Sequence, residues 1–484
     1  MPDVLAAGAG VCRAEAVEVV CREGGTRLGQ LFGEDPPIPF QKTGDGSWDL
    51  GLEGGHSIRR ILYHGDTTGN AMLTAFHTWI SREPRIDVQT DTMALDLITR
   101  HHNTADPRNV YEPNAGLGAY LFRYSDGTMD TVRAAYTVLA TGGCGQIYQY
   151  TSNPPIATGD GLAMAIRAGI PLINMEYTQF HPTVLHHRDY GGFLISEAVR
   201  GEGAVLRDYD GQKIMTSKVH PQQDLAPRDT VTREILRSMA RCAAPCVFLD
   251  ACHMSSEFWQ NRFPAIYSLL KKANLDPSHE WIPVVPAFHF HCGGIPATMD
   301  GESPLHNVYA IGEASCTGIH GANRLAGMSL LEGVVCGQRC AEHIARRRKD
   351  RVPAPAHKDI PVRDWEPYPG VDKIERTWLE QDWSTLRQIM WNYVGPVRSQ
   401  RLLQRAIHDL RYLSSRIDDF YHSYAIERSI IELRNAVSVG LSIARSAYMR
   451  RESYGCHYRS DFPPPGDSHR SSSTPPHQNG AEAP

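Results

Sequence analysis

Two short apolar segments, each followed by a glycine-containing turn and a helical pattern, constrain the fold of this sequence more than any other feature. Residues 136–140 (YTVLA) lead into the turn TGG, and residues 307–311 (NVYAI) lead into the turn GE. The helical patterns that follow begin near residues 158 and 329. Short apolar runs bounded by turn residues predict buried strands, and the order of strand, turn and helix predicts an α/β fold.

The composition of the other segments predicts how the chain is divided into domains. A length of 484 residues is enough for two or three domains with buried cores. Residues 174–291 are rich in aromatic residues, histidine and proline, and we interpret them as an inserted α+β capping domain that covers a ligand. The flanking segments 1–173 and 292–350 then form the two parts of the α/β domain, and residues 364–461 form a helical domain. The terminal segment 462–484, rich in Pro, Ser and Gly, is predicted to be disordered.

Three local patterns give more specific predictions. The first 25 residues alternate apolar and charged positions, which favours a surface helix over a secretory signal. Residues 103–118 are polar and are predicted to form a mobile loop. Pro396 interrupts a helical pattern, so we expect the helix to bend or end there.

Charge, hydropathy and cysteine content argue against several classes of protein. The formal net charge is −5, from 49 Lys and Arg against 54 Asp and Glu, which is unlike the basic balance of a general nucleic-acid binder. No apolar run reaches the roughly 18 residues that a membrane helix needs. The eleven cysteines lack the paired spacing of a zinc site, so we expect no metal centre and reduced thiols in a cytoplasmic protein.

Both turns are placed where a cofactor binds in an open α/β sheet, at the carboxyl ends of strands. The carboxylate of Glu313 can accept hydrogen bonds from ribose or ribitol hydroxyls, and a helix that begins at Ser329 directs its positive end toward a group such as a flavin carbonyl. Either turn alone also fits an ordinary strand-to-helix corner. A dinucleotide site normally begins with a strand and a G-x-G-x-x-G turn. The early candidate GAG at 8–10 has no preceding strand and has Arg13 at the third glycine position, so this fingerprint is absent from the sequence.

Ten longer motifs carry a resemblance to a known family. They are EGGHSIRRIL (53–62), DTTG (66–69), ATGG (140–143), NPPIATGDG (153–161), NMEYTQFHPT (174–183), ISEAVRGEGA (195–204), LAPRD (225–229), HFHCGG (289–294), YAIGEASCTGIHGANRLA (309–326) and RRESYGCHYRSDFP (450–463). In these segments the chain resembles the L-aspartate oxidases, which are similar to the flavoprotein subunits of succinate dehydrogenase and fumarate reductase. The resemblance covers nearly the whole chain except its C-terminal tail, and EGGHS and HGANRLA favour the L-aspartate oxidases within that group.

The resemblance implies a fold and an activity. The fold is an FAD-binding Rossmann-like domain with an inserted capping domain and a C-terminal helical domain. In the family the first βαβ unit, with its glycine fingerprint, precedes the residues that begin this sequence, so we expect the FAD-binding domain to be N-terminally incomplete and non-covalent FAD binding to be impaired. The activity is oxidation of L-aspartate to iminoaspartate, with O2 (giving H2O2) or fumarate as electron acceptor. In the family this is the first step of quinolinate and NAD biosynthesis, which makes quinolinate synthase an expected partner.

The resemblance also implies the residues of the active site. Arg228 corresponds to the residue that the family uses as proton donor or acceptor, although an arginine pKa above about 12 equally suits a carboxylate clamp, and both roles remain open. Glu53 corresponds to the acidic residue that recognises the substrate ammonium group. The other substrate-binding residues are Gln179, His181, Ser196, Glu197, His289 and Arg324. The cofactor-binding residues are Thr141, Gly142, Gly143, Asp160, Glu313, Ser329 and Leu330.

Two departures from the family pattern keep other functions open. Gly327 and Met328 replace a serine–asparagine pair that commonly precedes the last flavin helix, and Ser196 replaces a common threonine. One alternative is a flavoprotein of the succinate dehydrogenase or fumarate reductase type. A carboxylate at position 53 argues against this alternative, because it suits an amino acid better than succinate. The other is a catalytically silent, truncated fragment, which the absent fingerprint and the lost amide side chain both favour.

Overall fold

The structure of this chain is a computed structural model that describes residues 1–349, 360–366 and 372–464. Two parallel strands lie at its centre, β6 (Thr137–Leu139) and β12 (Val308–Ala310), paired with Val308 opposite Thr137. They confirm the two strands that the apolar segments predicted. Because parallel strands end at the same edge of a sheet, the glycine-containing turns that follow them lie next to each other.

A helix follows each of these strands, as the sequence predicted. Helix α5 (Asp160–Arg167) comes after β6, and helix α10 (Met328–Lys349) comes after β12. Gly169 follows α5 with a φ of +78°, a left-handed conformation that glycine adopts without steric penalty and that commonly ends a helix. Short elements complete this region: η3 (Gly145–Ile147), β11 (Ile295–Pro296), η5 (Gly312–Ala314) and β13 (Ser315–Cys316), of which β11 and β13 pair in parallel.

A three-stranded antiparallel sheet with the order β3-β4-β5 packs against α5. Its region contains β3 (Thr92–Thr99), α4 (Arg100–Asn103), η2 (Pro107–Tyr111), β4 (Gly116–Arg123) and β5 (Met129–Arg133). Between α4 and β4 the chain contains no helix or strand other than η2, so the loop predicted around 103–118 is confirmed for residues 104–115, and only its ends belong to α4 and β4. Polar side chains in this segment bind backbone groups: Asn103 Oδ1 accepts from the Thr99 amide at 2.8 Å, and Asn114 Oδ1 accepts from the His101 amide at 3.2 Å.

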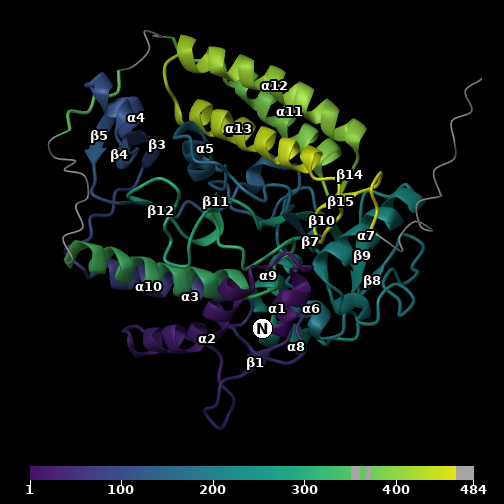
Figure 1. Cartoon of the computed structure of the whole chain (residues 1–484). Helices are drawn as coiled ribbons and strands as arrows, with labels where there is room; N and C mark the ends of the chain where they lie inside the picture. Colours follow the sequence, from purple (N-terminus) through teal and green to yellow (C-terminus); the bar gives the residue numbers. More distant parts are fainter. Residues whose placement is uncertain (350–359, 367–371, 465–484) are drawn as a thin grey trace, which may run out of the picture.

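A four-stranded antiparallel sheet with the order β7-β10-β9-β8 lies to one side of the parallel strands, on the right in Figure 1. Its region contains β7 (Thr178–Leu185), α6 (Glu197–Gly201), β8 (Val205–Arg207), η4 (Gln223–Leu225), α7 (Arg228–Cys242), β9 (Val247–Asp250), α8 (Ser256–Arg262), α9 (Pro264–Lys272) and β10 (Ile282–His291). All eight residues of β7 are buried. The register between β7 and β10 shifts between Phe288 and Phe290, so His289 is the extra residue of a β-bulge, which re-aims its side chain.

The N-terminal region packs against α10. It contains α1 (Pro2–Ala7), α2 (Ala14–Gln30), η1 (Leu31–Gly33), β1 (Leu50–Gly51), β2 (Ile61–Leu62) and α3 (Thr68–Ser81). Helix α2 buries Val17 and Val20, and its Arg27 forms an ion pair with Glu342 of α10 at 2.9 Å. This helix confirms the amphipathic pattern of the first 25 residues. The GAG segment at 8–10 follows α1 and not a strand, as expected from its sequence context.

Three long helices at the top of Figure 1 form the C-terminal part of the described chain. They are α11 (Arg376–Val394), α12 (Gln400–Ser423) and α13 (Arg428–Met449). The short strand β14 (Val397–Arg398), between α11 and α12, pairs in parallel with β15 (Tyr458–Arg459), which follows α13. Helix α11 ends two residues before Pro396, which confirms the predicted break. The three helices share one hydrophobic core with α5 and the three-stranded sheet. The disorder predicted for 462–484 falls, from residue 465 onward, outside the described residues.

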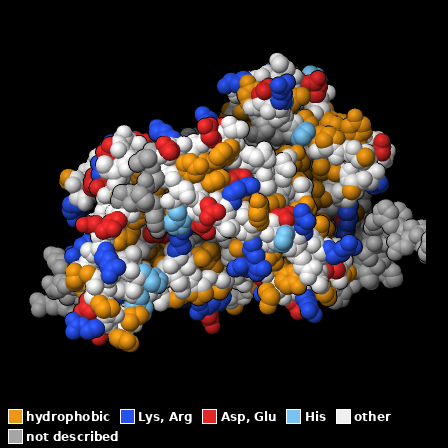
Figure 2. All heavy atoms as spheres, turned by 90° about the horizontal axis from the view of Figure 1, so that it is seen from above, with side chains coloured by type: hydrophobic (Ala, Val, Ile, Leu, Met, Phe, Trp, Pro, Cys, Tyr) orange, Lys and Arg blue, Asp and Glu red, His pale blue; other side chains and the backbone are white. Residues whose placement is uncertain are grey.

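The face shown in Figure 2 mixes cationic, anionic and hydrophobic side chains. This arrangement differs from the continuous basic stripe that nucleic-acid binders use on their contact face. Among the helices that the structure describes, none combines the length and apolar character needed to cross a membrane.

Arg398 ties the C-terminal helices to the four-stranded sheet through a fully buried guanidinium. It donates to the carbonyl oxygens of Glu176 at 2.7 Å and Gly395 at 2.9 Å and to Thr178 Oγ1 at 2.5 Å. It also donates to His457 Nδ1 at 2.8 Å. Burial and the charge of Arg398 lower the pKa of His457 to about 3, so the imidazole stays neutral and accepts this bond.

We predict that Arg398→Met lowers the melting temperature of the chain by several degrees. The substitution keeps most of the side-chain volume but removes the donor to Glu176, Gly395 and Thr178, and each lost charge-assisted hydrogen bond costs about 1.5–3 kcal/mol. Thermal unfolding followed by intrinsic fluorescence measures the change. Arg401→Met, at an exposed position of α12, is the control and should change stability by less than about 0.5 kcal/mol. Equal losses in both variants would contradict this role of Arg398.

Candidate active site

One cavity of about 540 Å³ brings together residues from distant parts of the sequence. It lies where the four-stranded sheet, the start of α10 and the N-terminal region meet. Its polar end is lined by Glu53, His181, Ser196, Glu197, Arg228, His289 and Arg324, and its apolar end by Leu28, Phe40, Leu62, Met72, Leu331 and Val334. The cavity therefore collects seven of the eight residues predicted for catalysis and substrate binding. The eighth, Gln179, is fully buried behind the cavity wall.

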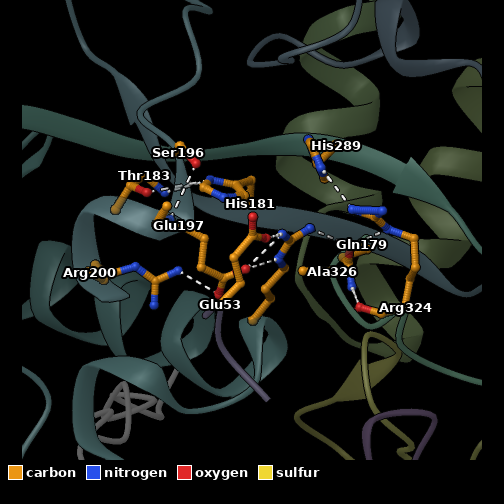
Figure 3. Close-up of polar contacts among 12 residues, drawn as sticks. Glu53, Gln179, His181, Thr183, Ser196, Glu197, Arg200, His289, Arg324 and Ala326 are labelled. Atoms are coloured by element: carbon orange, nitrogen blue, oxygen red, sulfur yellow. Dashed lines mark hydrogen bonds and ion pairs between the residues drawn. The ribbon is translucent and has the colours of Figure 1, made fainter. Parts of the chain in front are cut away.

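The carboxylate of Glu197, on α6, holds two arginines. Arg228, the first residue of α7, approaches Glu197 Oε2 with Nε at 2.8 Å and with NH2 at 2.7 Å. Arg200 donates to Glu197 Oε1 at 2.9 Å (Figure 3). Burial by itself raises the pKa of Glu197, but the charges of Arg228 and Arg200 outweigh it and lower the pKa to about 2. Glu197 is therefore ionised and fixes the guanidinium of Arg228 at the cavity wall.

Gln179, on β7, bridges the two arginines of the cavity. Its Oε1 accepts from Arg228 NH1 at 3.2 Å and from Arg324 Nε at 3.4 Å. Its Nε2 donates to Asn323 Oδ1 and to the Arg324 carbonyl oxygen, both at 2.7 Å. Both donors and both lone pairs of the amide are in use, so in this arrangement Gln179 positions the arginines and has no group left for a ligand.

Two hydrogen-bond acceptors, Glu53 and His56, also line the cavity. Glu53 lies 3.9 Å from Arg228 NH2 (Oε2 to nitrogen), and burial and the nearby Glu197 raise its pKa. His56, three residues further on, also lines the cavity, and its Nε2 donates to the Ala326 carbonyl oxygen at 3.1 Å. Its Nδ1 is then an acceptor, and it has no partner among the described residues. His56 belongs to the EGGHSIRRIL motif (53–62), but it was not predicted to be a site residue.

Two neutral donors complete the polar end. His181 Nδ1 accepts from the Thr183 amide at 3.2 Å, so the proton of the neutral ring is on Nε2, which has no partner among the described residues. Burial, and then the charge of Arg228, lower the pKa of His181 well below its usual value, so the ring stays neutral. Ser196 caps α6 by accepting from the Ala198 amide at 3.3 Å, which leaves its hydroxyl proton for a ligand.

Arg324 is held from three sides. It donates through NH1 to Ser329 Oγ at 2.5 Å and through NH2 to His289 Nε2 at 3.1 Å, and its guanidinium lies 4.7 Å from the ring centre of Phe290. Figure 3 shows the contact between Arg324 and His289 on one side of the site. Burial and repulsion from Arg228 lower the pKa of Arg324 to about 10, so it remains a cation near neutral pH. A carboxylate that enters here meets a fixed, desolvated positive charge.

Comparison with known proteins places this arrangement in a family. The family model for an FAD binding domain matches residues 1–330, and the model for the fumarate reductase flavoprotein C-terminal region matches residues 383–481. The chain is 40% identical over 468 residues to L-aspartate oxidase of Pseudomonas aeruginosa, covering 95% of this chain and 84% of that protein. It is 41% identical over 464 residues to L-aspartate oxidase of Yersinia pestis, covering 95% of this chain and 85% of that protein. The chain belongs to the L-aspartate oxidase family.

A solved structure supports the same assignment at the level of the fold. The quinol fumarate reductase FrdA of E. coli matches with a TM-score of 0.81 and 28% identity, covering 95% of this chain and 80% of that chain. These findings confirm the resemblance that the ten motifs predicted. They also confirm the predicted fold class, with an FAD-binding domain and a C-terminal helical domain.

FAD is the cofactor of this L-aspartate oxidase family member, and the residues around a second cavity fit a flavin. That cavity has a volume of about 320 Å³ and is lined by His289, Phe290, Glu313, Arg324, Ser329 and Leu330. Ser329 and Leu330 belong to the first turn of α10, where backbone N–H groups lack helical acceptors and attract partial negative charge. Burial raises the pKa of Glu313 to about 7, and the His291 amide donates to its Oε1 at 2.9 Å. The donor set therefore suits a polar, partly negative ring system and its hydroxylated chain.

The other predicted cofactor residues lie near Glu313 or further away. The turn of Thr141, Gly142 and Gly143 follows β6, and a Cβ at Gly143 would lie only 2.2 Å from Glu313 Oε1, so glycine permits this close approach. Asp160 lines neither cavity. Its Oδ1 accepts from Asn435 Nδ2 of α13 at 2.8 Å, so in this structure it connects α5 to the helical region.

We predict that Glu313→Gln stabilises the chain more at about pH 8 than at about pH 5. Burial raises the pKa of Glu313 from 4.5 to about 7, so between these values the folded chain keeps a proton that the unfolded chain releases. Stability conferred by the protonated form is therefore lost as the pH rises through this window. Glutamine keeps the acceptor for the His291 amide and does not titrate. Melting temperatures of both proteins measure the effect, and a difference that is independent of pH would refute it.

Proposed function

We propose that this chain oxidises L-aspartate to iminoaspartate, with O2 (giving H2O2) or fumarate as the final electron acceptor. Bound FAD would supply the two-electron acceptor for the hydride that leaves the α-carbon. The membership of the L-aspartate oxidase family supports this proposal, and so does the charge pattern of the 540 Å³ cavity. Two arginines and two neutral donors complement a dicarboxylate, and one carboxylate complements an ammonium group.

The observation that carries the proposal is Glu53 in a cavity otherwise built for anions. A carboxylate beside a dicarboxylic acid would repel it, whereas a carboxylate beside an amino acid binds the ammonium group. Because burial and Glu197 raise the pKa of Glu53, its carboxylate is also a better base for the proton that the amine must lose. We propose that Glu53 both recognises the ammonium group and accepts that proton.

The remaining roles follow from the contacts around the cavity. We propose that Arg324, His181 and Ser196 bind one substrate carboxylate, and that His289 contributes a further contact. Arg228 is the proposed catalytic residue, as proton donor or acceptor or as the clamp for the second carboxylate. Its bonds to Glu197 and Gln179 fix the guanidinium, as either role requires. Glu313, Ser329 and Leu330 are the proposed flavin-binding residues, together with the turn at Thr141, Gly142 and Gly143 and with Asp160.

The product fits a place in NAD biosynthesis. An imine hydrolyses in water, so iminoaspartate needs an enzyme that consumes it soon after release. We propose quinolinate synthase as that partner and the cytoplasm as the compartment.

A second candidate activity is succinate oxidation or fumarate reduction. It is favoured by the likeness to the quinol fumarate reductase FrdA of E. coli and by the match to a fumarate reductase flavoprotein C-terminal model. Arg228, Arg324 and His181 would bind succinate as well as aspartate. Glu53 is the group for which the two activities make opposite demands.

We predict that Glu53→Gln lowers kcat/KM for L-aspartate by about 10- to 150-fold, the factor that corresponds to a charge-assisted hydrogen bond of about 1.5–3 kcal/mol. Turnover of succinate or fumarate by the FAD-loaded chain should stay the same or rise, because neither carries an ammonium group and the substitution removes a carboxylate that repels them. Steady-state kinetics with both substrates measures the ratio. Glu202→Gln is the control, since Glu202 has the same side-chain exposure as Glu53, 23%, and does not line the cavity. Parallel losses for both substrates would count against the proposed role of Glu53.

A further inference from the structure

The ring of His289 is held between a serine and an arginine, and this determines where its proton is. His289 Nδ1 lies 2.8 Å from Ser152 Oγ, and His289 Nε2 lies 3.1 Å from Arg324 NH2. Ser152 Oγ in turn lies 3.3 Å from the Phe288 carbonyl oxygen. Ser152 follows a backbone bridge between Thr151 and Phe288, so the serine is fixed against the strand that carries the histidine.

The chemistry of these groups leaves one consistent set of hydrogen bonds. A guanidinium only donates, so His289 Nε2 must present its lone pair to Arg324. A neutral imidazole has one proton, which is then on Nδ1 and is donated to Ser152 Oγ. The serine hydroxyl passes its own proton toward the Phe288 carbonyl oxygen, which only accepts. Both ring nitrogens are therefore engaged, and neither offers a proton to the cavity.

The charged and titratable groups around the ring keep it neutral before a ligand binds. The ring of His181 on β7 lies 5.1 Å away between ring centres, Arg228 faces His289 from α7, and Arg324 contacts it directly. Glu197 on α6 favours protonation of the ring, and the carboxyl groups of Glu53 and Glu313 line the same cavities as His289. Burial, followed by Arg228 and Arg324, lowers the pKa of His289 well below its usual value.

A carboxylate that binds Arg324 changes this balance. It takes the guanidinium N–H away from His289 Nε2 and places oxygen lone pairs against the nitrogen lone pair, which is repulsive. If Ser152 keeps the Nδ1 proton in place, the ring becomes a donor to the carboxylate only by gaining a second proton at Nε2. The new negative charge also favours the imidazolium form.

We propose that Ser152 is a positioning residue that holds His289 in its Nδ1–H tautomer, and that a dicarboxylate enters the site together with one proton, which His289 takes up at Nε2. The inference rests on the proposed function, because it assumes that the cavity binds a dicarboxylate. In the step, a solvent proton forms an N–H bond at Nε2 and no electrons are transferred. On release of the dicarboxylate the proton returns to solvent, and Arg324 again donates to the neutral ring.

The tautomer is tested in the whole chain of 484 residues without a ligand, by nitrogen NMR of histidine-labelled protein. The signals of His289 are assigned by their loss in His289→Gln. In the wild type they should report a neutral ring with the proton on Nδ1, and in Ser152→Ala a large share of the ring should shift to the Nε2–H form. A wild-type ring with its proton on Nε2, or an unchanged ring in Ser152→Ala, would overturn the proposal.

Proton uptake is tested by calorimetric titration of the FAD-loaded chain with malonate, a dicarboxylate that has neither an amino group nor a second methylene carbon and therefore cannot be dehydrogenated. Titrations in buffers of different ionisation enthalpy give the number of protons taken up. The wild type should take up close to one proton per malonate near neutral pH, and Ser152→Ala less than half as much, because its neutral ring can become an Nε2–H donor. His289→Gln should take up about one proton fewer than the wild type, and any uptake that remains in this variant belongs to other groups of the cavity such as Glu53, whose pKa an incoming dianion raises further. A purely structural role of Ser152 would weaken binding without changing this number.

Thr151→Val is the matched control. Thr151 Oγ1 also lies 3.3 Å from the Phe288 carbonyl oxygen but forms no hydrogen bond with the His289 ring, so this variant should take up as many protons as the wild type. Malonate binding without proton uptake in the wild type would overturn the inference and leave the proposed function standing. A wild-type chain that binds no malonate would instead contradict the dicarboxylate site on which the proposed function depends.

Discussion

The buried ion pairs of Glu197 are the interaction on which the rest of the site depends. Arg228, Arg200 and Arg324 are all buried, and burying a guanidinium without a partner is strongly unfavourable. The carboxylate of Glu197 pairs with two of these arginines, Arg200 and Arg228. Gln179 connects Arg228 to Arg324 through its amide oxygen. These contacts within the protein offset the free energy that burial of the guanidinium groups costs. The third cation, Arg324, is left with neutral partners and is ready for an anionic substrate.

The fold brings these charges together by joining two sheets of different kinds. The parallel pair β6 and β12 places the turn at Gly143 against Glu313, one of the residues proposed to bind flavin. The antiparallel strands β7 and β10 carry Gln179, His181 and His289, and the bulge in β10 turns His289 toward Arg324. The start of α10 lies between the two sets, so the cavities of about 540 and 320 Å³ share His289, Arg324, Ser329 and Leu330 as lining residues.

The sequence predicted the features that depend on local patterns and missed those that depend on distant partners. Both central strands, their helices and the break before Pro396 follow from apolar runs, glycine turns and proline, which act within a few residues. The motifs also named seven residues that do line one cavity. Polarity also predicted the loop between α4 and β4, but not that Asn103 and Asn114 bind backbone amides at its ends.

The orientation of individual side chains could not be read from the sequence. Gln179 was predicted to bind substrate, yet its amide is used by Arg228 and Arg324, which are far from it in the chain. The partnership of Ser152 with His289 spans 137 residues, and that of His56 with Ala326 spans 270. Such contacts depend on tertiary packing and on side-chain rotamers. A sequence motif indicates which residue type stands at a position, but not which groups its side chain binds.

The visible absorption spectrum of the FAD-loaded chain, recorded without oxygen before and after addition of L-aspartate, tests the central claim most directly. We expect L-aspartate to remove the visible band of oxidised flavin, because the site orients the amino acid for hydride transfer. Admission of oxygen should then restore the band. A band that survives L-aspartate but is lost with succinate would contradict the assignment of the cavity to an amino acid. A band that survives both would show that the arrangement around Arg228 and Glu53 does not support this chemistry.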